Sequence, residues 1–95
     1  MEIKSNSNNV TINGNIKSVS DFQIIKQYID SIVNQHKNIT INITDSLSIT
    51  SSVIGYLNKL VLHDSININM SIGNSQLIDL LNDLNLVSVF KVKKV

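Results

Sequence analysis

The sequence predicts an α/β protein: one domain, residues 1–95, built on a mixed, mostly parallel sheet of about five strands with helices mainly on one face. Two patterns support this fold class. Segments in which every second residue is apolar alternate along the chain with segments whose apolar residues recur at helical spacing. Strands that alternate with helices are joined by right-handed crossovers and run parallel to their neighbours. A chain of 95 residues forms one such domain and is too short for two.

Two stretches have the alternation of a half-buried strand. Residues 39–43 read ITINI and residues 66–72 read ININMSI. A strand covered on both faces has a nearly continuous apolar run instead, so we expect one face of the sheet to be polar. Shorter strands are expected at Ile3, at 10–12 and at 87–92. The predicted order is then β-β-α-β-α-β-α-β.

Three segments have the apolar stripe of an amphipathic helix. The stripes are Phe22, Ile25, Ile29, Ile32 and Val33 in the first, Val53, Ile54, Leu57, Leu60 and Val61 in the second, and Leu77, Ile78, Leu81 and Leu84 in the third. Their starts follow from residues that cap helices. We expect Ser20 with Gln23 as a capping box, Ser51 or Ser52 as the second cap, and Asn74 or Ser75 as the third. Asn85 suits the left-handed position after the third helix.

The pair Asn13–Gly14 allows two interpretations. It is a strong signal for a hairpin turn between Ile12 and Ile16. However, a helix start follows within a few residues, which favours a turn at the end of a strand.

Charge and cysteine content exclude several functions. Eight basic residues balance seven acidic ones, so the chain lacks the positive field of a nucleic-acid-binding protein. Lys91, Lys93 and Lys94 are expected at a solvated strand end. The absence of cysteine excludes disulfides and thiolate ligands for zinc. Neither a signal-peptide pattern nor an apolar run of ~20 residues is present, so we expect a cytoplasmic protein that does not insert into a membrane.

No catalytic, metal or cofactor site is predicted. His36 and His63 fall at the expected ends of two helices, where a cation complements the helix dipole. The chain has no HExxH sequence, no glycine-rich phosphate loop and no closely spaced carboxylate pair. We therefore predict that the protein is not an enzyme.

Residues 44–60, TDSLSITSSVIGYLNKL, are the most informative stretch. A hydroxyl-rich loop follows a central strand and leads directly into a helix. In one interpretation Ser51 and Ser52 simply cap that helix. In the other, an exposed serine there is a phosphorylation site, because free N–H groups and the helix dipole stabilise a phosphate.

The chain resembles the STAS domains, the family of anti-sigma-factor antagonists and their relatives. The resemblance covers nearly the whole chain: both central strands, the helix opening ITSSVIGYL, Gly14 before the first helix, and the tail LLNDLNLVSVFKV. The tail residues that match the family's ending are Leu80, Leu84, Leu86, Phe90 and Val92.

The resemblance implies a partner switch. An antagonist of this family binds a GHKL-type serine kinase that is also an anti-sigma factor, phosphorylation of a serine in an Asp-Ser-Ser-Gly motif releases it, and a PP2C-type phosphatase resets it. In this chain Ser52 matches the phospho-acceptor, with Ser51 as second choice, while Thr50 and Val53 stand where the family has Asp and Gly.

A docking surface is expected at the start of the second helix. Its predicted residues are Thr50, Ser51, Ser52, Val53, Gly55, Tyr56 and Lys59. The alternative is a STAS subunit that docks constitutively on another protein, as in a lipid-transport ABC system. The changed residue at position 50 favours this alternative, and the retained pair of serines favours the switch.

Overall fold

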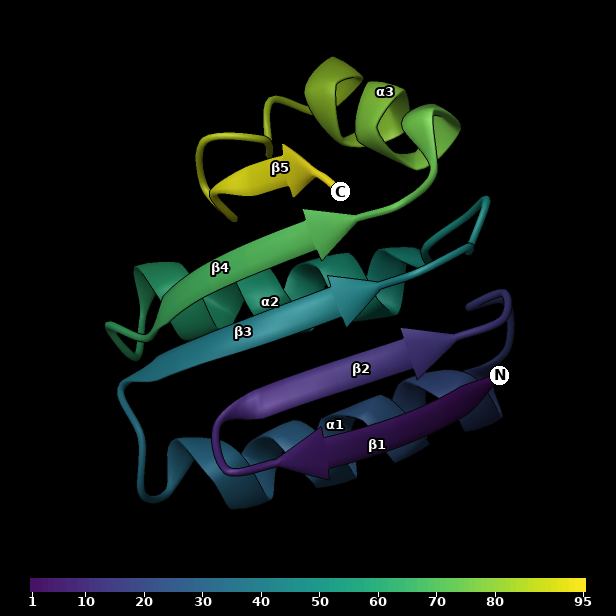
Figure 1. Ribbon diagram of the computed structural model, residues 1–95. Coiled ribbons are helices and arrows are strands. Elements are labelled where there is room, and N and C mark those ends of the chain that lie inside the picture. Colours follow the sequence, from purple (N-terminus) through teal and green to yellow (C-terminus); the bar gives the residue numbers. More distant parts are fainter.

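The computed structural model describes residues 1–95 as a five-stranded sheet with three helices (Figure 1). The elements are β1 (Glu2–Asn6), β2 (Asn9–Asn13), α1 (Val19–Val33), β3 (Asn38–Ile43), α2 (Ser51–Leu62), β4 (Asn67–Ile72), α3 (Ser75–Asp83) and β5 (Val92–Lys94). The strands lie side by side in chain order. β1 runs antiparallel to β2, and the other three neighbouring pairs are parallel. The predicted α/β class, mixed sheet and element order are confirmed.

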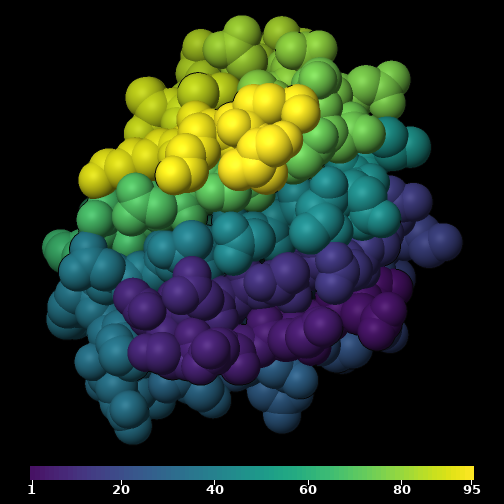
Figure 2. Space-filling view, in the orientation of Figure 1, coloured from purple at the N-terminus to yellow at the C-terminus, as the bar shows by residue number.

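The two faces of the sheet differ as the alternation predicts. α1 and α2 cover one face, and α3 lies beside β4 and β5 (Figure 1). Ile39, Ile41 and Ile43 of β3 are buried against the helices, whereas Thr40 and Asn42 between them lie on the opposite, uncovered face. Figure 2 shows this uncovered face, which the strands cross from edge to edge. Isoleucine suits these strands because its branched side chain is stiff and packs well on a pleated surface.

The first two strands form a hairpin through Ser7 and Asn8. Asn6 pairs with Asn9, so the loop has two residues, and Ser7 has the positive φ of 55° that such a turn requires. Gly14 has a φ of 88° and lies where β2 ends, before the loop to α1. The interpretation of Asn13–Gly14 as a strand-end turn is therefore confirmed.

Helix caps agree with the prediction for α3 and not for α1. Asn74 caps α3, and Asn85 follows it with a φ of 60°. α1 begins two residues earlier than the predicted capping box, so Ser20 is wrong. Its cap is Ser18, whose hydroxyl accepts from the Asp21 N–H at 3.0 Å while the Asp21 carboxylate accepts from the Ser18 N–H at 3.2 Å.

The closing strand is shorter than predicted. The sequence indicates residues 87–92, but residues 87–91 form turns and β5 covers only Val92–Lys94. The Phe90 N–H donates to the Leu86 carbonyl at 3.0 Å, and the Phe90 side chain is fully buried. The apolar residues that predicted a strand over 87–91 therefore belong to turns, from which the Phe90 ring packs into the core. No helix combines the length and the apolar character needed to cross a bilayer.

Candidate functional site

Two loops meet at the edge of the sheet where β2 and β3 end. Because these neighbouring strands are parallel, the segment before α1 and the segment before α2 leave the sheet side by side. Three backbone N–H groups donate across them: Gly14 to the Asp45 carboxylate at 2.7 Å, Ile16 to Ser46 Oγ at 3.0 Å, and Leu47 to Asn15 Oδ1 at 2.9 Å. The loops therefore form one connected structure.

Most hydroxyl groups of the second loop hold the fold together. Ser46 is fully buried and donates to the Ser48 carbonyl at 2.6 Å. The Ser48 hydroxyl in turn donates to the Ile16 carbonyl at 3.0 Å. Thr44 donates to Asn13 Oδ1 at 2.7 Å. The buried Ser46 hydroxyl needs such a partner, and the bonds of the half-buried Ser48 and the exposed Thr44 tie the loop to its neighbours.

α2 is capped by Thr50 and not by either of the serines that the sequence suggested. Thr50 has extended backbone angles, and its Oγ1 accepts from the Val53 N–H at 3.2 Å. Ser51 and Ser52 are therefore the first two residues of the helix itself. Both are exposed, and neither hydroxyl forms a hydrogen bond within the chain. These two hydroxyls differ in this respect from the hydroxyls of the preceding loop.

Ser52 borders a small cleft between the starts of α1 and α2. The cleft has a volume of about 130 Å³ and is lined by Lys17, Ser18, Val19, Phe22, Thr50 and Ser52. Sequence analysis did not identify the residues at the start of α1 that line this cleft. The β2–β3 pairing brings Lys17 and Val19 here, and the available signal was the expectation that these two strands are parallel neighbours.

Two apolar side chains are exposed at the same end of the molecule. Val19, which lines the cleft, is 73% exposed, and Leu47 in the second loop is 52% exposed. Burial of exposed apolar surface favours association with another protein. This end of the domain thus combines free hydroxyls, a lysine and accessible apolar area.

The predicted docking residues divide into two groups. Val53 is buried in the core and Tyr56 is half-buried against α1, so neither presents an accessible side chain, and the half-buried Thr50 is the helix cap. Ser51, Ser52, Gly55 and Lys59 are exposed. At 100° per residue these four positions fall within about 100° of each other around α2. They form one accessible face, which we call the α2 face.

Tyr56 joins the helices through its ring and its hydroxyl group. The ring meets Phe22 edge-on, with centroids 6.1 Å apart, and Lys26 Nζ lies 5.6 Å from its centre. The hydroxyl donates a hydrogen bond to the carboxylate of Asp30. Burial and this bond raise the pKa of Tyr56 well above its ordinary value. Partial burial of Asp30 opposes its ionisation, but hydrogen bonds from Lys26 and Tyr56 outweigh that effect and lower its pKa.

The electrostatics around Ser52 favour an anion. The first turn of α2 contains no acidic residue, so its N–H groups carry an uncompensated partial positive charge. Lys17 adds a full positive charge on the opposite side of the cleft.

The two histidines lie away from this site. His63 is the residue that ends α2, at the opposite end of the helix from Ser52, with its Nδ1 3.3 Å from the Asp64 carboxylate. His36 follows α1, and its backbone N–H donates to the Ile32 carbonyl at 3.0 Å. The fold brings neither imidazole to the cleft.

Comparison with known proteins gives no match to a protein-family model, a curated protein or a solved structure. The resemblance to STAS domains therefore rests on the sequence pattern.

Proposed function

We propose that this chain is a cytoplasmic, non-enzymatic protein-binding switch of the anti-sigma-factor-antagonist type, with Ser52 as its phospho-acceptor and Ser51 as the second choice. One observation carries the proposal. In the hydroxyl-rich stretch that opens α2, Thr50 provides the cap, and the Ser52 hydroxyl is exposed and unbonded beside a cleft. A kinase can therefore modify Ser52 without breaking a hydrogen bond of the fold.

The surroundings of Ser52 suit a phosphate. A phosphoserine carries about −1.5 to −2 charges at pH 7. In the first turn of α2 those charges lie near free N–H groups, and Lys17 lines the same cleft. The modified protein is expected to keep its fold while its surface changes from neutral hydroxyl to dianion.

The α2 face is the surface through which a partner would detect that change of charge. Ser51, Ser52, Gly55 and Lys59 are accessible together, and Val19 and Leu47 add exposed apolar area at the same end. An unpaired dianion inside an interface weakens binding strongly, because its desolvation is not repaid. Phosphorylation would then release a partner that binds the unmodified face.

The proposed partners follow from the STAS resemblance: a GHKL-type serine kinase acting as anti-sigma factor, and a PP2C-type phosphatase. A constitutively docked subunit of a larger complex, such as a lipid-transport ABC system, is the second candidate. It is favoured by Thr50, which leaves no carboxylate next to the acceptor serine.

The test compares immobilised wild-type protein with Ser52→Glu in a pull-down from cells that express the chain, with partners identified by mass spectrometry. Ser51→Glu is the matched control, since it places the same charge on the adjacent exposed residue. We expect a GHKL-type kinase to be retained by the wild type and lost with Ser52→Glu, and phosphate to be found on Ser52 of protein isolated from those cells. Retention of one partner, such as a transporter ATPase, by all three baits would establish constitutive docking instead.

A further inference from the structure

The edge strand β1 is an accessible surface at the side of the sheet farther from α2 (Figure 1). β1 pairs only with β2, and its five residues, Glu2–Asn6, are paired in a continuous register without a proline. Its outer side presents unpaired N–H and C=O groups. The opposite edge, β5, has only three residues, of which Lys93 and Lys94 are exposed, and short lysine-rich edges resist pairing. The edge open to another strand is therefore β1.

The hydrogen bonds of β2 define which peptide groups of β1 face outward. The Ile12 carbonyl accepts from the Thr44 N–H at 3.1 Å, so the peptide groups of Ile12 turn toward β3. Ile3 lies opposite Ile12 in the antiparallel pair and is therefore not bonded to it. Bonded and non-bonded pairs alternate along such a ladder, so the N–H and C=O groups of Ser5 also point away from the sheet.

The same pairing fixes the direction of the side chains. Ile3 lies opposite a buried residue of β2 and packs against the core, on the face that the helices cover. Glu2 and Lys4 lie on either side of Ile3 and are exposed on the uncovered face. Neither takes part in an ion pair of the molecule. The edge strand thus carries one acid and one base, with an apolar residue between them.

This arrangement is complementary to itself in one register. When two copies of β1 pair antiparallel about Ile3, Glu2 of each copy lies opposite Lys4 of the other, and Ile3 lies opposite Ile3. Pairing centred on Glu2 or on Lys4 would instead place like charges opposite each other, which is destabilising. Pairing centred on Ser5 would leave both charges without a partner. The charges of β1 therefore select the register centred on Ile3.

We propose that β1 pairs with β1 of a second copy of this chain about a two-fold axis at Ile3, which joins the two five-stranded sheets into one. The N–H of Ile3 in each copy donates to the Ile3 carbonyl of the other, and the N–H of Ser5 donates to the Met1 carbonyl. This surface is separate from the α2 face, so both copies keep that face accessible. The assignment goes beyond the proposed switch and does not rest on it.

The helices leave room for this pairing. α1 contacts both β1 and β3, so it lies over β2, between them. In the paired sheet the two β2 strands are three strand spacings apart, about 14 Å. Helices that pack directly have axes about 8–10 Å apart. The two α1 helices therefore do not collide, and the space between them, over the two β1 strands, is open to side chains from this edge.

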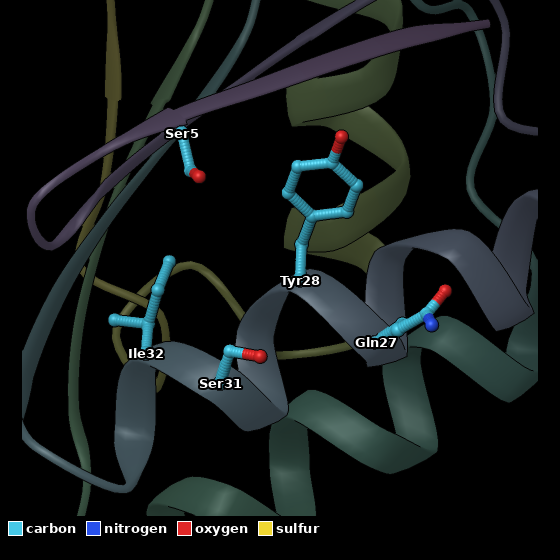
Figure 3. Close-up of a pocket in the computed structure, with 5 residues that line it drawn as sticks. All are labelled: Ser5, Gln27, Tyr28, Ser31 and Ile32. Atoms are coloured by element: carbon cyan, nitrogen blue, oxygen red, sulfur yellow. The ribbon is translucent and has the colours of Figure 1, made fainter.

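Apolar side chains are available to fill that space. Ile24 and Tyr28 are exposed one turn apart on α1. A cavity of about 280 Å³ lies between α1 and β1 and is lined by Ser5, Gln27, Tyr28, Ser31 and Ile32. Figure 3 shows the Tyr28 ring and the Ile32 side chain extending from α1 toward β1, with Ser5 above them. Met1 of the second copy lies opposite Ser5, so its side chain is placed at the mouth of this cavity.

Sedimentation equilibrium of charge variants tests the pairing. We expect the wild type to dimerise reversibly at about 0.1–1 mM, because a single pair of edge strands is a small interface. Lys4→Glu opposes two acids at both ends of the pairing and should weaken the dimer about tenfold, and Glu2→Lys should do the same with two bases. An equimolar mixture of these two variants should associate as tightly as the wild type, since each acid again faces a base. Lys93→Glu on β5 is the matched control and should change nothing.

The register and the hydrogen bonds have their own tests. In a mixture of isotope-labelled and unlabelled protein, NMR should detect contact between the α-hydrogens of Glu2 and Lys4 of different copies, and exchange of the Ile3 amide should slow as the protein concentration rises. Ser5→Pro removes an outward N–H that β2 does not use and should abolish dimerisation, whereas Ser5→Ala keeps that N–H and should retain it.

Three results would overturn the proposal. They are a dimer that is indifferent to the charges at positions 2 and 4, contacts between copies at another surface, and a wild type that stays monomeric at about 1 mM. The last would leave β1 to an extended segment of another protein. Ser52→Glu should dimerise as the wild type does, so failure of this pairing and failure of the proposed switch are distinguishable.

Discussion

The hydroxyl group of Tyr56 on α2 donates to the carboxylate of Asp30 on α1, and this bond joins the two helices that cover the sheet. Asp30 also accepts from Lys26 Nζ at 2.8 Å, so one carboxylate collects donors from both helices. Together with the edge-on contact of Tyr56 and Phe22, this cluster fixes how α2, and with it Ser52, lies relative to α1.

Removing the hydroxyl group should loosen this contact. We expect Tyr56→Phe to lower the free energy of unfolding by about 1 kcal/mol, the usual net value of one hydrogen bond, while the ring contact with Phe22 remains. The pKa of Asp30 should rise, because one of its donors is lost. Urea denaturation measures the first effect and an NMR titration of the Asp30 carboxyl carbon the second. Tyr28→Phe is the matched control, since no hydrogen bond of the Tyr28 hydroxyl is found, and its stability should stay within error of wild type. Identical values for Tyr56→Phe and wild type would contradict the role given to this bond.

Stability should fall at both extremes of pH. The pKa of Asp21 is lowered, first by the backbone N–H of Lys17, and the pKa of Asp30 is lowered by its donors. Their contribution is present above the ordinary value of 3.8 and is lost as the pH falls through their folded-state pKa values. Tyr56 has a raised pKa, so its contribution is present below 10.0 and is lost as the pH rises beyond it.

Denaturation curves collected from pH 2 to pH 11 test these signs. The difference between wild type and Tyr56→Phe should shrink above about pH 10, where the unfolded tyrosine ionises. A difference that stays constant or grows with alkaline pH would show that the Tyr56–Asp30 bond does not hold the tyrosine proton.

An acidic residue at position 52 should stabilise the fold. Ser52→Asp adds a negative charge to a first turn that has none, near Lys17, and we expect a gain of about 0.5 kcal/mol. Ser52→Asn is the uncharged control and should show no such gain. The gain should also decrease with added salt, because surface charges are screened. A loss of stability in Ser52→Asp would indicate that this position does not accept an anion.

Two glycines should respond oppositely to alanine. A Cβ on Gly55 meets no atom within 4 Å, so Gly55→Ala should stabilise α2 by about 0.5–1 kcal/mol. A Cβ on Gly73 would lie 2.1 Å from the Thr44 carbonyl oxygen, where nothing can give way without moving the backbone. Gly73→Ala should therefore destabilise by more than about 2 kcal/mol. Thermal melts measure both effects: Gly55→Ala should melt above the wild type and Gly73→Ala below it. Equal melting temperatures for the two variants would refute the packing described around Gly73.

The central strands and helix order were predictable because burial on one face imposes a period on the sequence. Ile39, Ile41 and Ile43 show that period directly. The cap of α1 could not be predicted in this way. Ser18 and Ser20 are both good capping residues, and Ser18 is the cap because Asp21 lies three residues after it and completes the capping box. The prediction of a closing strand over 87–92 was wrong for a similar reason. Val87 and Val89 alternate as in a strand, but they pack against the core from a turn.

The candidate site was predictable only in part. The exposed serines followed from their place at a helix start, but Thr50 takes the cap because its backbone is already extended there. The contribution of Lys17 required the register of β2 against β3, which no local pattern contains. Tyr56 was expected to be accessible because it falls on the more polar side of α2. Only the packing of α1 against α2 shows that its ring and hydroxyl contact Phe22 and Asp30.

The hydrogen bonds between the two loops have a consequence for the kinetics of association. Loops that must become ordered on binding lose conformational entropy at that moment, which reduces affinity. Here Ser46 and its neighbours already hold the segments before α1 and α2 in one arrangement. A partner that approaches this end of the domain meets a rigid surface, so encounter is limited by orientation and charge rather than by folding of the loops. Changes in affinity at this surface should accordingly appear in the dissociation rate.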